Sequence, residues 1–240
     1  MDTNLDLSEP RYVAQSKRPG NAEKACRQTR RVYDLLAPLY PVSSLMFHSR
    51  AHRAALSASH IQNGSRVLEV ATGSGEMLKR VARLNPDGQT IGVDLSPNMA
   101  ARSQAGARKR LPRTRIHCHA ADVRYLPFHS ATFDTVVCCY LFELLPQGEL
   151  ARSFAELTRV LRPGGNLTVI LVGQNKSSFN AMYSVCTAVA PAFWGRQVAN
   201  QVMELLQGHG YSVDKDYYVQ QIHYSSRVVS ATLGRPHRSR

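Results

Sequence analysis

The segment from residue 67 to residue 75 carries residue types whose spacing could bind a nucleoside-like ligand. It reads Val67-Leu68-Glu69-Val70-Ala71-Thr72-Gly73-Ser74-Gly75, an apolar run followed by a loop of small residues. Small residues at positions 71, 73 and 75 let the backbone turn sharply and let a ligand approach main-chain N–H groups. A helix that begins after Gly75 adds the positive end of its dipole. Asp94 closes the next apolar run, where a carboxylate is placed to accept hydrogen bonds from a ribose diol.

The residue types in this loop distinguish two classes of cofactor. A dinucleotide enzyme needs Gly-x-Gly-x-x-Gly to seat a pyrophosphate. The segment Ala71-Thr72-Gly73-Ser74-Gly75-Glu76-Met77-Leu78 has no third glycine at the helix-packing position. Glu69 also places a carboxylate immediately before the turn, where it would repel a pyrophosphate. That carboxylate suits an ammonium group, held directly or through the loop and water.

Apolar runs alternate with segments of helical spacing, and this alternation must position the loop. The runs typical of strands are residues 66–70, 90–93, 115–120, 132–140 and 166–172, and the helical segments between them are 75–84, 97–109 and 150–161. This alternation predicts βαβ units in a parallel sheet. Two helices are expected earlier, at 23–37 and 43–59, and a helix at 196–208 is expected later, with strands at 211–219 and 225–233. The last two strands are joined too closely for a helical crossover, so they should pair antiparallel.

The expected fold is therefore α/β: a Rossmann-like, doubly wound sheet of seven strands, mostly parallel with an antiparallel C-terminal hairpin. Residues 1–25 are polar and aperiodic and should form a flexible tail. Residues 26–60 are the expected N-terminal helical cap, and residues 61–240 the cofactor-binding domain. Within that domain, the aromatic and apolar segment 174–195 is interpreted as a substrate lid, although its helical spacing is also that of a core helix.

Composition and charge limit the functional class. Of the 240 residues 43% are hydrophobic, which excludes a mainly disordered chain, and no run approaches the roughly 18 apolar residues of a spanning helix. The chain has no apolar signal region, and its five cysteines match no disulfide or zinc spacing, so we expect a cytoplasmic, reduced protein without a metal.

The net charge of +13 favours nucleic acid or an anionic membrane face as a partner. Six basic and no acidic residues lie from Arg102 to Arg115, as a solvated helix face or an anion-binding patch.

Together these segments resemble the class I S-adenosylmethionine-dependent methyltransferases. Within that class the chain is similar to the methyltransferase domain 11 group, which includes the ubiquinone/menaquinone C-methyltransferases. The resemblance covers about residues 30–172. Its motifs are Glu69 to Gly75, Asp94, Ala121-Asp122-Val123 with Leu126-Pro127-Phe128, Phe133-Asp134-Thr135-Val136-Val137, Leu161-Arg162-Pro163-Gly164-Gly165, and the N-terminal segment Tyr33 to Tyr40, which in the family closes over the cofactor.

The resemblance implies S-adenosyl-L-methionine as the cofactor and assigns residues to it. Asp94 would bind the ribose, and Asp122 would accept a hydrogen bond from the adenine amino group. The complete expected cofactor site is Tyr33, Tyr40, Glu69, Ala71, Thr72, Gly73, Gly75, Asp94, Leu95, Met99, Ala121, Asp122, Val123, Cys139 and Tyr140.

The methyl acceptor is less closely defined by the sequence. The quinone enzymes read Tyr-Asp-x-Met-Asn where this chain has Tyr40-Pro41-Val42-Ser43-Ser44, and Leu141-Phe142-Glu143-Leu144-Leu145 differs from the quinone signature. The N-terminal segment and the basic charge also resemble those of bacterial phosphatidylethanolamine N-methyltransferases of this fold. We therefore expect a small or lipid-like acceptor, a quinone precursor or a phospholipid amine, and peripheral contact with an anionic membrane.

A carbon or hydroxyl nucleophile must also lose a proton. The candidate bases are Glu143 and Tyr140 at the carboxyl end of the fourth strand and His48 from the cap. An amine would need only an aromatic or carboxylate cage. A nucleic-acid methyltransferase is disfavoured because Cys139-Tyr140-Leu141-Phe142 lacks the Asn/Asp-Pro-Pro-Tyr/Phe motif. The complete cofactor motifs disfavour a third alternative, a non-catalytic binding relative, and the sequence indicates no oligomeric state.

Overall fold

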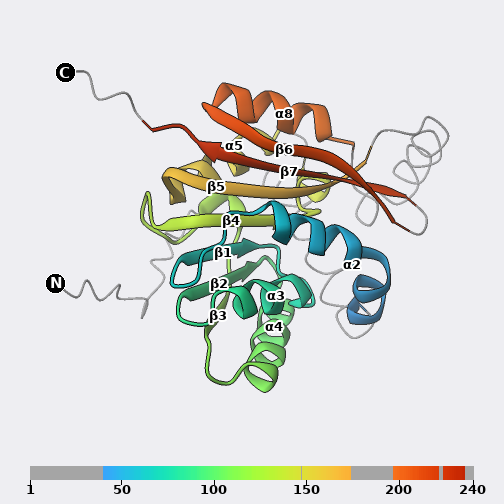
Figure 1. Ribbon diagram of the computed structural model, residues 1–240, viewed down its shortest axis with the longest axis vertical. Coiled ribbons are helices and arrows are strands. Elements are labelled where there is room, and N and C mark those ends of the chain that lie inside the picture. Colours follow the sequence, from blue (N-terminus) through green and yellow to red (C-terminus); the bar gives the residue numbers. More distant parts are fainter. Residues whose placement is uncertain (1–39, 147, 174–196, 222–223, 236–240) are drawn as a thin grey trace, which may run out of the picture.

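A computed structural model describes residues 40–146, 148–173, 197–221 and 224–235 (Figure 1). The helices and strands in chain order are α2 (Tyr40–Ala58), β1 (Arg66–Val70), α3 (Glu76–Leu84), β2 (Gln89–Asp94), α4 (Pro97–Arg110), β3 (Arg115–Ala120), β4 (Phe133–Cys139), α5 (Leu150–Val160), β5 (Leu161–Val172), α8 (Ala199–Gly208), β6 (Tyr211–Gln220) and β7 (Ser225–Leu233). Two short 3-10 turns, η1 (Val123–Tyr125) and η2 (Phe142–Leu144), follow β3 and β4. Apart from β5, and from the two turns, which were not predicted, each described element lies within a few residues of its expected position.

The strands form one seven-stranded sheet in the order β3-β2-β1-β4-β5-β7-β6. Strands β1 to β5 pair in parallel, and β7 runs antiparallel to both β5 and β6. This confirms the predicted mostly parallel sheet with an antiparallel C-terminal hairpin. The reversal of strand order between β1 and β4 creates a topological switch point, where ligands of open α/β sheets bind at the carboxyl ends of the strands.

Strand β5 differs from the prediction because it begins at Leu161 and not at Asn166. Its pairing with β4 jumps from Phe133↔Leu161 to Thr135↔Asn166, so the intervening Pro163-Gly164-Gly165 forms an irregular bulge within the strand. The two glycines and the proline suggest a turn outside the sheet. The neighbouring β4 nevertheless pairs with the residues on both sides of this segment, Leu161 and Asn166, so the segment remains part of the strand.

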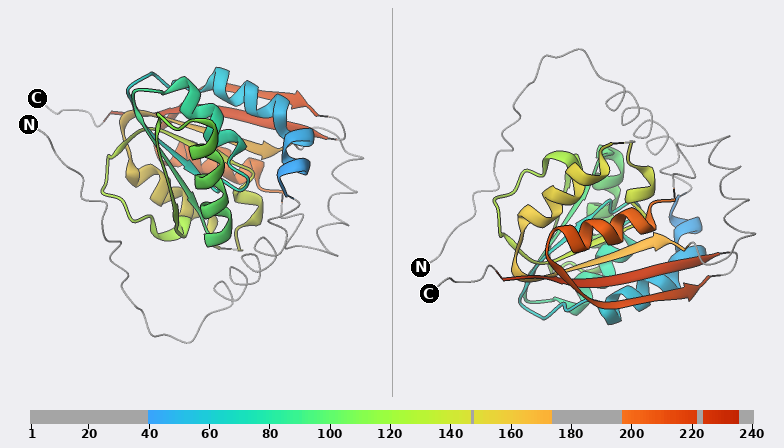
Figure 2. Two further views of the ribbon diagram at one scale, coloured as in Figure 1. Left: turned by 90° about the horizontal axis from the view of Figure 1, so that it is seen from below. Right: turned by 90° about the horizontal axis from the view of Figure 1, so that it is seen from above.

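Helices cover both faces of the sheet (Figure 2). On one face α5 and α8 pack against the strands in the largest apolar cluster, which contains the fully buried rings of Phe133, Phe142 and Phe154. On the other face α2 and α3 pack against Val67, Val137, Ile170 and Val228. Because both faces are covered, the inner strands are almost continuously apolar, as parallel strands usually are.

The described part of the expected N-terminal cap is a helix of this second layer. Ala51, Ala55 and Ala58 of α2 are buried at helical spacing against the sheet, and small side chains there allow close packing. The hydroxyl of Tyr217 on β6 donates a hydrogen bond to the carbonyl oxygen of Ala54 (2.9 Å). Helix α2 therefore stabilises the domain itself.

Several sequence predictions lie outside the described residues: the tail 1–25, Tyr33 and the lid 174–195. Tyr40 and His48 belong to α2, but their side chains are not among those described. No helix of the described ranges is both long and apolar enough to cross a bilayer.

Candidate functional site

The loop between β1 and α3 turns through three left-handed backbone conformations. Ala71, Gly73 and Gly75 have φ angles of 61°, 50° and 72°. The Thr72 N–H donates to the carbonyl oxygen of Val93 (3.2 Å), which ties the loop to β2, and the Gly75 N–H donates to the carbonyl oxygen of Thr72 (2.8 Å). The two glycines follow from these angles, because a Cβ atom in the left-handed region costs about 1–2 kcal/mol. Ala71 adopts the same conformation although it carries a Cβ atom.

Asp94 ends β2 directly opposite this loop, and backbone groups hold its carboxylate. Its Oδ2 accepts a hydrogen bond from the Gly73 N–H (2.8 Å), and its Oδ1 accepts one from the Ser96 N–H (2.9 Å). Ser96 then caps α4 by accepting from the Met99 N–H (3.1 Å), and Pro97 occupies the first turn of that helix. The cap thus fixes the turn that carries Asp94.

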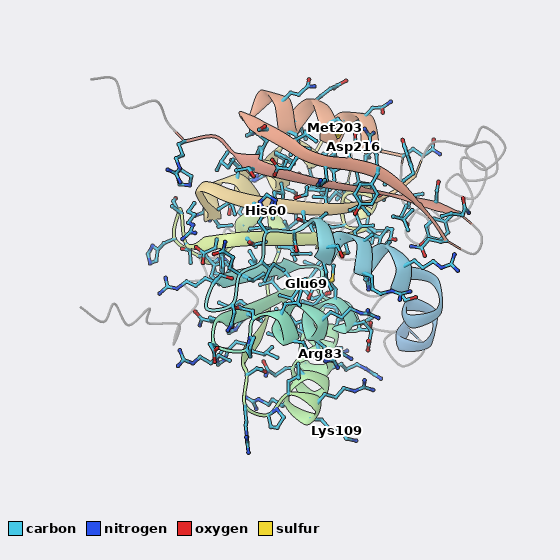
Figure 3. All side chains as sticks on the ribbon, in the orientation of Figure 1. His60, Glu69, Arg83, Lys109, Met203 and Asp216 are labelled. Carbon is cyan, nitrogen blue, oxygen red and sulfur yellow. The ribbon has the colours of Figure 1, made fainter. Side chains whose placement is uncertain are left out.

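Glu69 lies behind the loop and is almost completely buried (Figure 3). Burial raises the pKa of its carboxyl group well above the ordinary value, the negative charge of Asp94 raises it further, and Lys79 lowers it. Its Oε2 has no hydrogen-bond partner, and neither has the buried Oγ1 of Thr72. An unpartnered buried oxygen is costly, so a cationic ligand group on the other side of the loop would stabilise the Glu69 carboxylate.

One cavity at the carboxyl ends of β1, β2 and β4 collects most of the expected cofactor residues. The expected residues that line it are Ala71, Gly73, Asp94, Leu95, Ala121, Asp122, Val123, Cys139 and Tyr140. Four others lie behind this lining: Glu69, Thr72 and Met99 are buried, and Gly75 caps α3. The structure adds lining residues that the sequence interpretation missed: Val70, Val93, Leu141, Leu144, Leu145 and Pro146. Val70 and Val93 are apolar residues at strand ends, and the other four are apolar residues in and around η2. No motif separates such residues from ordinary core.

Asp122 follows β3 and caps the turn η1 by accepting from the Arg124 N–H (2.9 Å). Its carboxylate also pairs with the Arg124 guanidinium, with 2.7 Å between Oδ2 and Nη2. Asp122 therefore lines the cavity in a fixed orientation. The sequence interpretation found Asp122 but not its arginine partner.

The candidate base Tyr140 is engaged in a structural contact. Its backbone is left-handed (φ 53°), and its hydroxyl is 2.7 Å from the Ser226 Oγ at the start of β7. Burial raises the pKa of the phenol well above the ordinary value, and the neighbouring Tyr224 raises it further, so the group stays protonated near neutral pH. The hydroxyl thus connects the end of β4 to the C-terminal hairpin.

The candidate base Glu143 is also a connection between elements. Its Oε1 accepts a hydrogen bond from the Val172 N–H (2.7 Å) at the end of β5, and its buried Oε2 has no hydrogen-bond partner. Glu143 is 4% exposed and is not among the cavity-lining residues. Burial raises the pKa of its carboxyl group to about 7, although the Val172 N–H lowers it. Glu143 and Tyr140 together fix the turn after β4.

The raised pKa of Glu143 predicts a pH-dependent effect of Glu143→Gln. Because the pKa is about 7 in the folded state and about 4.3 when unfolded, the folded protein holds an extra proton between these values. Wild-type stability should therefore fall as pH rises from about 4 to 7. Glutamine cannot ionise, so the free energy of unfolding of Glu143→Gln relative to wild type should increase by about 2–3 kcal/mol between pH 5 and pH 8. Urea unfolding at both values measures this difference.

The exposed Glu204 on α8 offers a control for this experiment. Glu204→Gln makes the same chemical change without a buried carboxyl, and its effect should be small and similar at both pH values. If Glu143→Gln changes the free energy of unfolding equally at pH 5 and pH 8, the raised pKa of Glu143 is contradicted.

The basic patch from Arg102 to Arg115 lies mostly at the opposite edge of the sheet from the cavity. All six basic side chains are exposed. Arg115 pairs with Gln89 at the amino end of β2, whereas Ala120 pairs with Asp94 at the carboxyl end. Lys109 marks the far end of α4 (Figure 3). The patch is therefore separate from the cavity.

No three His, Cys, Asp or Glu side chains within the described ranges are grouped so that they could hold a metal ion. The chemistry that the cavity offers comes from two carboxylates at strand ends, loop N–H groups and apolar walls. This combination suits a nucleoside with a cationic amino-acid tail.

Comparisons with known sequences agree with this geometry. A family profile described as a methyltransferase domain matches residues 67–165. Demethylmenaquinone methyltransferase of Deinococcus radiodurans is 30% identical over 165 residues, which cover 66% of this chain and 66% of that protein. The protein of the same name from Thermus thermophilus is 30% identical over 154 residues, which cover 64% of this chain and 67% of that protein. The chain thus matches about two thirds of the length of these relatives.

Solved structures share the fold at lower identity. The methyltransferase in the Haloferax volcanii complex with the Trm112 methyltransferase activator has a TM-score of 0.74 and 17% identity, covering 88% of this chain and 100% of that chain. The N-methyltransferase NodS of Bradyrhizobium japonicum, solved with S-adenosyl-L-homocysteine, has a TM-score of 0.68 and 16% identity, covering 85% of this chain and 98% of that chain.

Proposed function

The chain belongs to the S-adenosylmethionine-dependent methyltransferases, and we propose that it methylates a small hydrophobic acceptor of the quinone-precursor class. The observation that carries the proposal is the cavity in which the glycine loop, Asp94 and Asp122 converge. The quinone class is supported by relatives that are named demethylmenaquinone methyltransferases and are 30% identical.

The residues of the cavity fit S-adenosylmethionine part by part. The loop N–H groups suit the carboxylate of the amino-acid end, and the Glu69 carboxyl, which is buried behind the loop, would attract the ligand's ammonium group through the loop. Asp94 would accept the ribose hydroxyls, because Gly73 and Ser96 already hold its carboxylate at the cavity edge. Asp122 would accept from the adenine amino group between the apolar walls made by Val123 and Leu145.

The bound cofactor supplies an electrophilic methyl group on a sulfonium. The task of this chain is then to orient the cofactor, hold the acceptor in line and exclude water, which can account for several kcal/mol of the barrier. Tyr140 and Glu143 fix the turn beside the reacting centre by bonding to Ser226 and Val172. Because both groups are engaged in these contacts, we propose an acceptor that needs no side-chain base for its attack, such as an electron-rich reduced quinone ring. Its ring carbon would take up the methyl group as the bond to sulfur breaks, and it would then lose its ring proton to water.

A methyl-transfer assay with three acceptors tests this proposal. The full chain is incubated with methyl-labelled S-adenosylmethionine and a short-chain demethylmenaquinol, phosphatidylethanolamine vesicles or transfer RNA. We expect label in the quinol fraction alone. Label in the lipid or RNA fraction without label in the quinol would contradict the acceptor class and favour a phospholipid amine or nucleic acid.

We also propose that the basic patch gives peripheral contact with anionic membranes. Arg108, Lys109 and Arg110 project from the end of α4 and are exposed, and each well-placed charge is worth about 1 kcal/mol at an anionic surface. Because the patch lies away from the cavity, the contact would concentrate the protein at the membrane without placing the cavity mouth on the bilayer.

Replacing Arg108, Lys109 and Arg110 with Gln should weaken low-salt co-sedimentation with phosphatidylglycerol vesicles by about tenfold or more. The matched control replaces the exposed Arg50, Arg53 and Arg83, which lowers the net charge equally at other places. Equal loss in both triple variants would show a general charge effect, and no sedimentation of the wild type would exclude membrane contact.

A further inference from the structure

We propose that Arg124 is a positioning residue that makes the cofactor site selective for adenine by fixing the Asp122 carboxylate. The inference rests on the proposed function, in which Asp122 accepts from the adenine amino group. Arg124 does not line the cavity, so it acts through Asp122.

The contacts between the two residues are close and directional. The Arg124 Nε–H lies 3.0 Å from both carboxylate oxygens of Asp122, and the Nη2 lies 2.7 Å from Oδ2. The Arg124 backbone N–H donates to Oδ1 (2.9 Å). Such a fork restricts both the plane and the direction of the carboxylate.

This arrangement leaves acceptor capacity for a ligand. A carboxylate offers about four acceptor sites, and the three N–H groups of Arg124 occupy about three of them. The Asp122 side chain remains 25% exposed, while that of Arg124 is 7% exposed. One acceptor site of Asp122 therefore remains for a ligand, on a carboxylate that lines the cavity and is held in place by Arg124.

Arg124 also connects the Asp122 turn to the start of α5 and to a second segment that lines the cavity. Its guanidinium lies 3.7 Å from Glu149, the residue before α5. The Glu149 N–H donates to the carbonyl oxygen of Pro146 (3.1 Å), and Pro146 lines the cavity. One buried cation thus connects two segments that line the cavity, the Asp122 turn and the segment that contains Pro146.

A second connection supports the same turn. The Leu126 N–H donates to Glu156 Oε2 (2.8 Å), and Arg159 Nη2 donates to the carbonyl oxygen of Leu126 (3.0 Å). Because α5 holds the end of this turn independently, loss of Arg124 should release the Asp122 carboxylate without releasing the whole loop. Asp122 and Glu149 would then face each other without the cation between them.

The test compares two ligands that differ at the six-position, which Asp122 would contact, and at the neighbouring N1, which carries a hydrogen only in the inosine ligand. S-adenosyl-L-homocysteine carries an amino group at the six-position of its base, and S-inosyl-L-homocysteine carries an oxygen there. Calorimetry gives the dissociation constants of both ligands for the full-length wild type, Arg124→Gln and Arg124→Lys. Arg152→Gln is the matched control, because this substitution removes the same charge from a neighbouring arginine. The guanidinium carbon of Arg152 lies 4.1 Å from the centre of the Tyr125 ring.

We expect the preference for the adenine ligand to fall about tenfold in Arg124→Gln, the scale of one hydrogen bond to a charged group. Arg124→Lys, which keeps the charge but loses the fork, should lie between it and the wild type. Arg152→Gln should keep the wild-type preference. In the Asp122→Asn background, Arg124→Gln should cause no further loss of preference, since Arg124 acts through Asp122.

The outcomes separate the two proposals. A wild type that binds neither ligand would contradict the proposed cofactor. If the wild type prefers the adenine ligand and Arg124→Lys or a folded Arg124→Gln shows the same preference, the role of Arg124 is overturned while the proposed cofactor stands. A merely structural role would weaken both ligands equally and leave their ratio unchanged. Tighter binding of S-adenosyl-L-homocysteine by Arg124→Gln would show that Arg124 competes with the ligand, which also overturns the inference.

Discussion

Asp94→Ala should weaken S-adenosylhomocysteine binding by about a hundredfold or more. The substitution removes the carboxylate that would accept both ribose hydroxyls, and each hydrogen bond to a charged group contributes about 1.5–3 kcal/mol. It also releases the Gly73 N–H and the Ser96 N–H, which that carboxylate holds at 2.8 and 2.9 Å. The loop and the start of α4 would then lose a shared anchor. Isothermal titration calorimetry measures the affinity.

Two further variants make the Asp94 experiment specific. Asp94→Asn keeps one acceptor oxygen and should bind with intermediate affinity. Asp87→Ala removes an exposed acid whose carboxylate bonds to Asn63 on the surface, and it should bind as the wild type does. Wild-type affinity in Asp94→Ala would contradict the ribose assignment.

Gly75→Ala should lower the free energy of unfolding by about 2–4 kcal/mol and weaken S-adenosylhomocysteine binding by about tenfold or more. The φ angle of Gly75 is 72°, and an added Cβ would lie 3.1 Å from the Ser103 Cα and 2.9 Å from its Oγ. The Ser103 hydroxyl donates to the carbonyl oxygen of Gly73 (2.9 Å). The methyl group would therefore separate α4 from the loop. Urea unfolding and calorimetry measure the two effects.

Gly106→Ala is the matched control, made within α4. An added Cβ at Gly106 would meet no atom within 4 Å, and alanine is favoured over glycine in a helix interior by about 0.5–1 kcal/mol. This variant should be slightly more stable and bind normally. If Gly75→Ala and Gly106→Ala have equal free energies of unfolding, the close contact between Gly75 and Ser103 of α4 does not limit the residue at position 75.

The parts of the fold that follow from local patterns were predictable. Strand β1 is a short, mostly apolar run that is followed by a loop of small residues, and β3 and β7 have the predicted bounds. The position of Asp94 at a strand end followed from the same patterns, because parallel strands present their carboxyl ends at one edge. The bulge in β5 was not predictable, since pairing with β4 decides whether Pro163-Gly164-Gly165 lies inside or outside the strand.

The roles of polar residues in the site depend on partners that are distant in the sequence. Tyr140 and Glu143 are typical candidates for a base by residue type, but their hydroxyl and carboxylate bond to Ser226 and to the Val172 backbone. A partner 86 residues away leaves no local signal. The pairing of Asp122 with Arg124 is local, yet residue type alone does not tell whether an arginine side chain turns back into the protein.

Titration of the full-length wild type with S-adenosylhomocysteine, and separately with NADH, tests the central claim most directly. The arrangement of the loop, Asp94 and Asp122 around one cavity predicts saturable binding of one S-adenosylhomocysteine per chain, lost in Asp94→Ala, and no binding of NADH. Binding of NADH in preference to S-adenosylhomocysteine, or no saturable binding of S-adenosylhomocysteine, would contradict the assignment of the cavity.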